Sequence, residues 1–323
     1  MSVHRREFLR TMLAALPAVC VGRAQTLATG APPPVVINHN ADGRAEITEG
    51  RTLLVTLTFP TTVSRLAGSF PVEIETAAGL RFVEEQPLFF YPAGDGRTFR
   101  TILSAPLDAV AGDYPLRLTD GGGAGIVVGR EIITYRVTEG TYRRSALKLS
   151  NNFSEPPPQI RERIRREFET MVGVYKARTP RRWRAGFVRP VSDADANNFG
   201  VRRVVNGSKR YRHAGLDYRA PPGTPVRAVN DGVVVLSTTH WTPGQLVCVD
   251  HGGGIFSRYI HLSERRVRRG ETVRRGQVIA LSGKSGGQRT RPHLHVDVVV
   301  NGTQVSPKGL RQTAARLLAA EAS

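Results

Sequence analysis

Short runs of alternating apolar and polar residues, separated by glycine-rich turns, fill two long stretches of this 323-residue chain. Leu53, Val55 and Leu57 alternate with threonines in the first stretch, and residues 226–236 form one of the runs in the second. A period of two is typical of strands that bury one face. The pattern therefore predicts a mainly β protein, with enough chain for about two domains.

The two stretches are expected to form two different β domains. In the first, residues 35–140, several short strands lie between turns such as Gly94-Asp95-Gly96, which favours an immunoglobulin-like β-sandwich. The second, residues 183–306, is predicted to be a small antiparallel β domain punctuated by glycines. No cluster of histidines, cysteines or carboxylates stands out in the first stretch, so we expect the chemistry in the second.

A proline-led segment, residues 141–182, separates the two β stretches. After three consecutive prolines, Ile164, Phe168 and Met171 fall on one face of a helical pattern and arginines fill the other. This spacing predicts an amphipathic linker helix whose apolar face packs on a neighbouring domain. The alternative is a basic helix that lies on a membrane surface. Residues 307–323 have the Ala/Leu/Arg content of a C-terminal helical tail.

The first 24 residues have the features of a cleavable export signal. Arg5 and Arg6 precede an apolar run, residues 11–21, which is too short for a bilayer core that needs about 20 residues. The paired arginines resemble a twin-arginine signal, and residues 25–34 read as a Pro/Gly-rich spacer. We expect an exported protein, periplasmic or extracellular, with no transmembrane segment in the mature chain. A basic tail without a targeting role is the alternative.

The charge balance predicts a polyanionic partner. Lys and Arg number 46 against 27 Asp and Glu, a formal net charge of +19, which attracts nucleic acid, anionic membrane or anionic cell wall. An exported protein does not meet nucleic acid, and neither an aromatic-basic platform nor a recognition helix is evident. The sequence therefore favours an anionic cell wall.

The second β stretch contains four histidines and one aspartate that are candidates for chemistry: His213, Asp217, His261, His293 and His295. On a strand, His293 and His295 point to the same face. Catalytic zinc takes three nitrogen or oxygen ligands and leaves one position for water. Two imidazoles and one carboxylate meet that need, with imidazoles left for acid–base work. Spacing alone does not say which of the five bind the metal. The thiol of Cys248, in an apolar run, is predicted to be buried and structural.

Four separated motifs contain or flank these residues, in this order: His213-Ala214-Gly215-Leu216-Asp217, Pro222-Gly223-Thr224-Pro225-Val226, Tyr259-Ile260-His261-Leu262 and Pro292-His293-Leu294-His295. Together they resemble the lysostaphin/LytM family of zinc endopeptidases over about residues 185–305. The resemblance implies a small antiparallel β fold with the metal in a groove, and cleavage of peptide cross-links in peptidoglycan. The preceding β domain and helix are similar in layout to exported relatives with an immunoglobulin-like N-terminal domain.

The resemblance also implies a role for each of the five residues. His213, Asp217 and His295 would bind one zinc ion per chain. His293 would be the general base, and His261 would stabilise the oxyanion or protonate the leaving amine.

Three more residues are candidates for supporting roles. The segment 284–291 is one residue longer than the usual loop of the family, and Arg289 or Arg291 is expected to bind a stem-peptide carboxylate, because guanidinium forks match carboxylates. A solvated loop arginine is the alternative. Asp297 either hydrogen-bonds a metal-binding histidine and so orients its ring, without binding the metal itself, or faces water.

These observations predict an exported zinc endopeptidase that acts on the stem peptides and cross-links of peptidoglycan. The alternative is a catalytically inactive LytM-like module that binds the wall or activates another wall hydrolase. Such modules usually lack one or more ligands, whereas all three are present here. The bond that is cut, and whether the first domain shields the groove or positions the enzyme, stay open.

Overall fold

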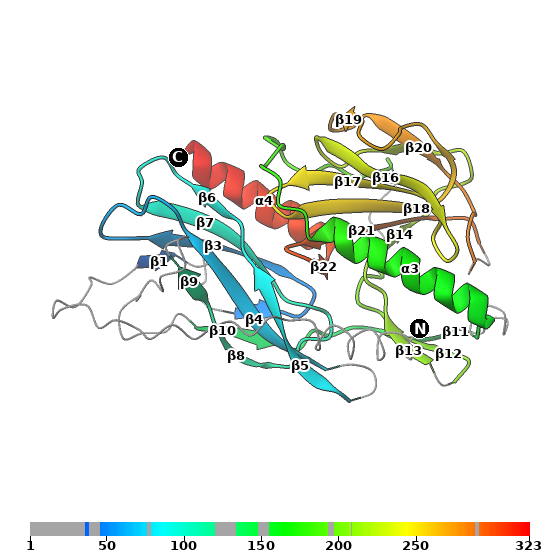
Figure 1. Ribbon diagram of the computed structural model, residues 1–323, viewed down its shortest axis with the longest axis horizontal. Coiled ribbons are helices and arrows are strands. Elements are labelled where there is room, and N and C mark those ends of the chain that lie inside the picture. Colours follow the sequence, from blue (N-terminus) through cyan, green and yellow to red (C-terminus); the bar gives the residue numbers. More distant parts are fainter. Residues whose placement is uncertain are drawn as a thin grey trace.

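The computed structural model describes residues 36–38, 46–75, 79–119, 134–147, 155–192, 197–207, 209–287 and 291–323. Strands predominate over two helices in these residues, so the predicted mainly β class is confirmed (Figure 1). The predicted export signal, residues 1–24, and the spacer, residues 25–34, lie outside the described residues. Neither described helix is long and apolar enough to cross a membrane.

The first β region contains three small sheets. Their strands are β1 (Val36–Asn38), β3 (Thr52–Thr58), β7 (Thr98–Ser104) and β6 (Phe90–Pro92); β2 (Glu46–Thr48), β10 (Thr134–Thr138) and β8 (Gly112–Pro115); and β5 (Arg81–Pro87), β4 (Ala67–Glu75) and β9 (Arg117–Thr119). Alternate residues of β3 are buried, as its period of two predicts. They share one apolar core with Phe70 of β4 and Tyr135 of β10. The sheets are therefore layers of one folded unit, and its immunoglobulin-like topology stays a prediction.

The second β region is built on a nine-stranded sheet whose strand pairs are all antiparallel. Its strands are β14 (Leu216–Tyr218), β15 (Pro225–Arg227), β16 (Gly232–His240), β17 (Gly244–Gly252), β18 (Ile255–Arg265), β19 (Thr272–Val273), β20 (Val278–Ser282), β21 (Leu294–Val300) and β22 (Thr303–Val305). The central strands run in the order β14-β21-β18-β17-β16-β19. Strand β21 therefore lies between β14 and β18, and we return to it below because it contains His295 and begins one residue after His293.

The two helices pack on opposite faces of this sheet (Figure 1). Helix α4 (Pro307–Ala322) is capped at its first turn by Ser306, whose hydroxyl accepts from Gly309 N. It buries Leu310 and Leu317 in the core that contains Val296 of β21. Helix α3 (Pro158–Tyr175) lies on the other face. The sheet is thus covered on both sides.

Helix α3 confirms the predicted linker helix, and it begins at a proline, which the first turn of a helix tolerates. Met171 is buried against Cys248, Phe256 and Val299, so this part of the apolar face packs on the sheet as expected. Phe168, however, is 46% exposed. The apolar stripe is therefore only partly covered, because the sheet lies under the C-terminal half of the helix.

The segment before α3 also pairs with the second region. Strand β11 (Arg144–Leu147) runs parallel to β12 (Arg202–Val205), which forms a hairpin with β13 (Lys209–Arg212). This three-stranded sheet ends one residue before His213.

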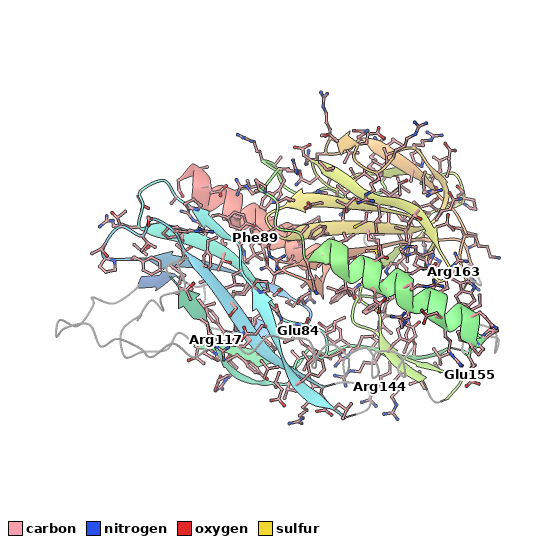
Figure 2. The ribbon with its side chains drawn as sticks, in the orientation of Figure 1. Glu84, Phe89, Arg117, Arg144, Glu155 and Arg163 are labelled. Atoms are coloured by element: carbon pink, nitrogen blue, oxygen red, sulfur yellow. The ribbon has the colours of Figure 1, made fainter. Side chains whose placement is uncertain are left out.

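Polar and aromatic contacts hold the first β region against the second. Glu49 is 1% exposed, and its two carboxylate oxygens accept from the Arg212 guanidinium at 2.9 and 3.3 Å. Thr52 of β3 and Thr313 of α4 share a hydrogen bond of 2.8 Å. Phe89 lies between the two regions (Figure 2), with the Arg178 guanidinium 5.5 Å from its ring centre. The two regions thus meet through specific side chains.

Candidate metal centre

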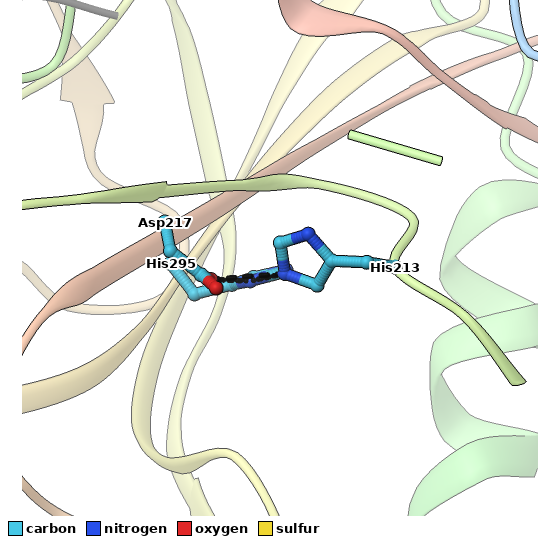
Figure 3. A group of neighbouring side chains, drawn as sticks. All are labelled: His213, Asp217 and His295. Carbon is cyan, nitrogen blue, oxygen red and sulfur yellow. Dashed lines mark hydrogen bonds and ion pairs between the residues drawn. The ribbon is translucent and has the colours of Figure 1, made fainter. Parts of the chain in front are cut away.

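The three residues that the family resemblance assigns to zinc meet at one point (Figure 3). Asp217 Oδ1 lies 2.9 Å from His213 Nε2 and 2.7 Å from His295 Nδ1. The two imidazole nitrogens are 3.1 Å apart. One nitrogen of each ring and one carboxylate oxygen therefore point at a common centre.

Strand pairing explains why these residues meet. Asp217 on β14 is the direct antiparallel partner of His295 on β21, so their side chains share a face. His213 reaches the same point from the end of β13, where its backbone N–H donates to Val201 O at 3.0 Å. Gly215 packs closely behind the cluster: a Cβ atom there would lie 2.5 Å from His295 Nε2 and 2.7 Å from Val296 O. The chain can pass at this point only because residue 215 has no side chain.

The second nitrogen of each ligand ring faces an acceptor. His213 Nδ1 donates to Asn198 O at 2.7 Å, and His295 Nε2 lies 3.5 Å from Asp297 Oδ2. Asp297 is fully buried and accepts from the Arg258 guanidinium at 2.7 and 3.0 Å. Burial alone would raise the pKa of Asp297, but the charge of Arg258 and the contact with His295 lower it to about 2. This carboxyl is therefore ionised beside the ring.

The inward-facing atoms fit a metal cation. With protons on the outer nitrogens, the inner atoms of His213, His295 and Asp217 are all acceptors, so a proton or a metal ion must lie among them. Burial lowers the pKa of His213. Burial would raise the pKa of Asp217, but its hydrogen bonds to His213 and His295 lower it. Burial would lower the pKa of His295, but its hydrogen bonds to Asp217 and Asp297 raise it. Two imidazoles and one carboxylate are a set that catalytic zinc uses.

His261 and His293 lie beside this cluster. Their ring centres are 5.0 Å apart, and His293 Nε2 is 3.8 Å from Asp217 Oδ1. His293 Nδ1 donates to Arg291 O at 3.0 Å, and His261 Nδ1 donates to Pro243 O at 2.8 Å. In each ring the Nδ1 proton is thus engaged by a backbone carbonyl, so a proton that the ring exchanges passes through Nε2. The structure brings all five candidate residues together.

Arg291, one of the two loop arginines, is exposed, and its backbone carbonyl oxygen accepts from His293 Nδ1. Arg289 lies outside the described residues.

Sequence reasoning missed three residues that hold the cluster from outside. Asn198 accepts from His213 and from Asp217 N, and its Nδ2 donates to Asp217 Oδ2 at 3.1 Å. Arg203 donates to the same oxygen at 3.0 Å. Arg258, which pairs with Asp297, lies between Phe256 and Ile260 on one face of an apolar strand. A charged residue at such a position indicates a buried ion pair, so the sequence could have pointed to Arg258. Asn198 and Arg203 carry no such signal, because only tertiary packing brings them near.

Two other reactive side chains of the second region, His251 and Cys248, are buried. His251 is fully buried, with Nδ1 on Asp231 O and Nε2 on the Ser257 hydroxyl. Burial lowers the pKa of His251 to about 4. Cys248 is also buried, which confirms that part of the expectation for its thiol.

Comparison with curated proteins finds relatives over the segment that contains this centre. Residues 211–307 match the peptidase family M23. The chain is 43% identical over 112 residues to the peptidoglycan DD-endopeptidase ShyA of Vibrio cholerae, covering 34% of this chain and 26% of ShyA. It is 36% identical over 154 residues to ShyC of the same organism, covering 46% of this chain and 35% of ShyC. The matches thus span about a quarter to a third of these relatives.

A solved structure shares the wider architecture. A protein of Pseudomonas aeruginosa assigned to peptidase M23 aligns with 82% of this chain and 95% of its own, at a TM-score of 0.59 and 23% identity. This likeness shows that the fold, including the first β region, is shared. Residues 211–307 of this chain therefore form a domain of peptidase family M23.

Proposed function

We propose that this protein is a zinc-dependent endopeptidase that hydrolyses the peptide cross-links of bacterial peptidoglycan. The observation that carries the proposal is the convergence of His213, Asp217 and His295, with two further imidazoles at the same place. The similarity to ShyA and ShyC, which are peptidoglycan DD-endopeptidases, supports the substrate class.

In this proposal His213 Nε2, Asp217 Oδ1 and His295 Nδ1 hold one zinc ion. When bound, zinc polarises the scissile carbonyl and lowers the pKa of water. The chain contributes the orientation of these ligands. Asn198 and Arg203 fix the outer oxygen of Asp217, and Asp297 holds the outer nitrogen of His295. Such partners typically change metal affinity or activity by about 10- to 100-fold when they are removed.

His293 and His261 would handle the protons. Because Nδ1 of each ring donates to a backbone carbonyl, Nε2 of His293 can accept a proton as general base. Nε2 of His261 can donate one to the oxyanion or to the leaving amine.

Substrate binding and location follow from the same proposal. Arg289 and Arg291 are proposed to bind a stem-peptide carboxylate, and an Arg291→Gly variant with unchanged kcat/KM on every muropeptide tested would remove that role. A peptidoglycan substrate requires export, and we propose a periplasmic or extracellular enzyme with the twin-arginine-like signal in residues 1–24. The positive charge suits an anionic wall.

The test combines metal content with hydrolysis. The wild-type protein should contain about one zinc per chain and release muropeptides from purified sacculi. His213→Ala should lose both, whereas His293→Ala should keep the metal and lose hydrolysis. Mass spectrometry of the released muropeptides identifies the bond. Retained metal and activity in His213→Ala would defeat the assignment, and zinc without hydrolysis of any sacculus would favour the inactive wall-binding module.

A further inference from the structure

We infer that Glu167, on helix α3, is a positioning residue for His261 and acts through the turn between β16 and β17. The inference rests on the proposed function, because it concerns the proton-transfer role proposed for His261. Glu167 lies outside the segment, residues 211–307, that matches the M23 family.

Glu167 reaches from the linker helix to the turn. Both of its carboxylate oxygens accept from the backbone N–H of Trp241, at 2.9 and 3.1 Å. The side chain is only 16% exposed, and Arg163 (labelled in Figure 2) donates to it at 2.7 Å from one helical turn earlier. Because Met171 packs α3 against the sheet, the Glu167 carboxylate is held in place relative to the sheet.

The same turn holds His261 by two bonds. Pro243 O, two residues after Trp241, accepts from His261 N at 2.9 Å and from His261 Nδ1 at 2.8 Å. His261 has a φ of 69°, which is uncommon for a residue with a side chain. A strained backbone of this kind persists where its surroundings hold it in place. The position of one carbonyl thus sets both the backbone and the ring of His261.

On the side away from Glu167, the turn packs tightly against residues 285–287. A Cβ atom on Gly244 would lie 2.3 Å from Ser285 C, and one on Gly286 would lie 2.4 Å from Thr242 O. Gly287 N donates to Thr242 O at 3.2 Å. The turn is therefore closed on one side by residues 285–287 and on the other by Glu167.

This arrangement gives α3 a function beyond connecting two regions. Removing the Glu167 carboxylate leaves the Trp241 N–H without its acceptor and lets the turn move away from residues 285–287. Pro243 O then no longer fixes the His261 ring, whose Nε2 must face the reacting groups. The metal ligands, on β14 and β21 and after β13, do not depend on this turn.

The test compares carboxylates of the same helix. Glu167→Ala should lower kcat on a soluble cross-linked muropeptide by about 10- to 100-fold, with KM within about twofold and zinc content unchanged. Glu167→Gln keeps an acceptor for Trp241 N–H and should recover most of kcat. Glu162→Ala is the matched control, because Glu162 pairs with Arg165 on α3, and it should behave as wild type. A kcat for Glu167→Ala equal to that of the control overturns the inference.

A spectroscopic arm separates this inference from the proposed function. In ¹⁵N spectra of the full chain, Glu167→Ala should change the His261 Nδ1 signal and speed hydrogen exchange at the Trp241 amide, while Glu162→Ala changes neither. These changes are expected even if the wild-type protein hydrolyses no muropeptide, an outcome that would sink the proposed function alone. Unchanged His261 and Trp241 signals in Glu167→Ala would overturn the positioning role.

Discussion

From Leu294 to Val298, the two faces of β21 are chemically opposite. On the face toward α4, Leu294, Val296 and Val298 are at most 3% exposed and lie in the apolar core. On the face toward α3, His295 and Asp297 alternate with them and contact charged partners. Because strand residues alternate faces, one backbone holds both a stabilising core and a reactive cluster.

The difference shows where stability and chemistry come from. Burying an aliphatic side chain contributes about 1.5–3 kcal/mol, whereas a buried ion pair such as Arg258 with Asp297 loses much of its attraction to desolvation. The polar face is therefore a poor source of stability. We infer that the polar face holds His295 in one orientation. The predictions below test whether stability comes from the apolar face and chemistry from the polar face, from the largest expected effect to the smallest.

Replacing His295 should abolish function with a much smaller effect on folding. His295→Ala removes a proposed metal ligand, so kcat/KM should fall by at least about 1,000-fold, about 4 kcal/mol of transition-state stabilisation. Hydrolysis of muropeptides and thermal unfolding of the metal-free protein are the measurements. A variant that unfolds before it loses activity would show that this face is structural.

Replacing Leu317 on the opposite side should do the reverse. Its side chain is fully buried in the core under β21, so Leu317→Ala should lower the free energy of unfolding by about 3 kcal/mol through the cavity it leaves. The kcat should stay within about twofold of wild type. Gln312→Ala, on the exposed side of the same helix, is the control and should change stability by less than about 0.5 kcal/mol.

His251 can be compared with His295 because it is a histidine on the apolar side of the sheet. The centres of the His251 and Phe187 rings are 5.4 Å apart. Its pKa is about 4 in the folded chain and 6.5 otherwise, so the unfolded state binds more protons between these values. The stability that His251 confers is therefore present above pH 6.5 and lost as the pH falls toward 4. Between pH 7 and 5 the loss should be about 2 kcal/mol. Denaturant unfolding of His251→Gln should show a correspondingly flatter pH dependence, and equal slopes would contradict the shift.

Cys248 should have the smallest effect. Burial raises the pKa of its thiol, so the native protein should not react with thiol reagents, whereas the unfolded chain should. Cys248→Ala should lower the free energy of unfolding by about 1 kcal/mol and leave kcat unchanged. Loss of activity on labelling the folded protein would mean that this thiol is reachable from the active face.

Much of this architecture could be predicted from the sequence. The period of two identified the β class, and the spacing after the prolines identified α3. The motifs identified five residues that the structure brings together. Periodicity says which residues share a face, but it does not say what covers that face. For this reason the exposure of Phe168, the contact of Glu167 with Trp241 and the approach of Arg203 to Asp217 could not be predicted.

The Glu49–Arg212 pair ties the thermodynamics of the two β regions together. Separating the regions would break this pair at the residue before His213 and would expose Tyr91 and Ile102, which the first region buries in the apolar core of the second. Independent melting of either part is thus disfavoured. Calorimetry of the full chain should record a single cooperative heat-absorption peak, with disruption of the His213–Asp217–His295 cluster coinciding with disruption of the N-terminal sheets.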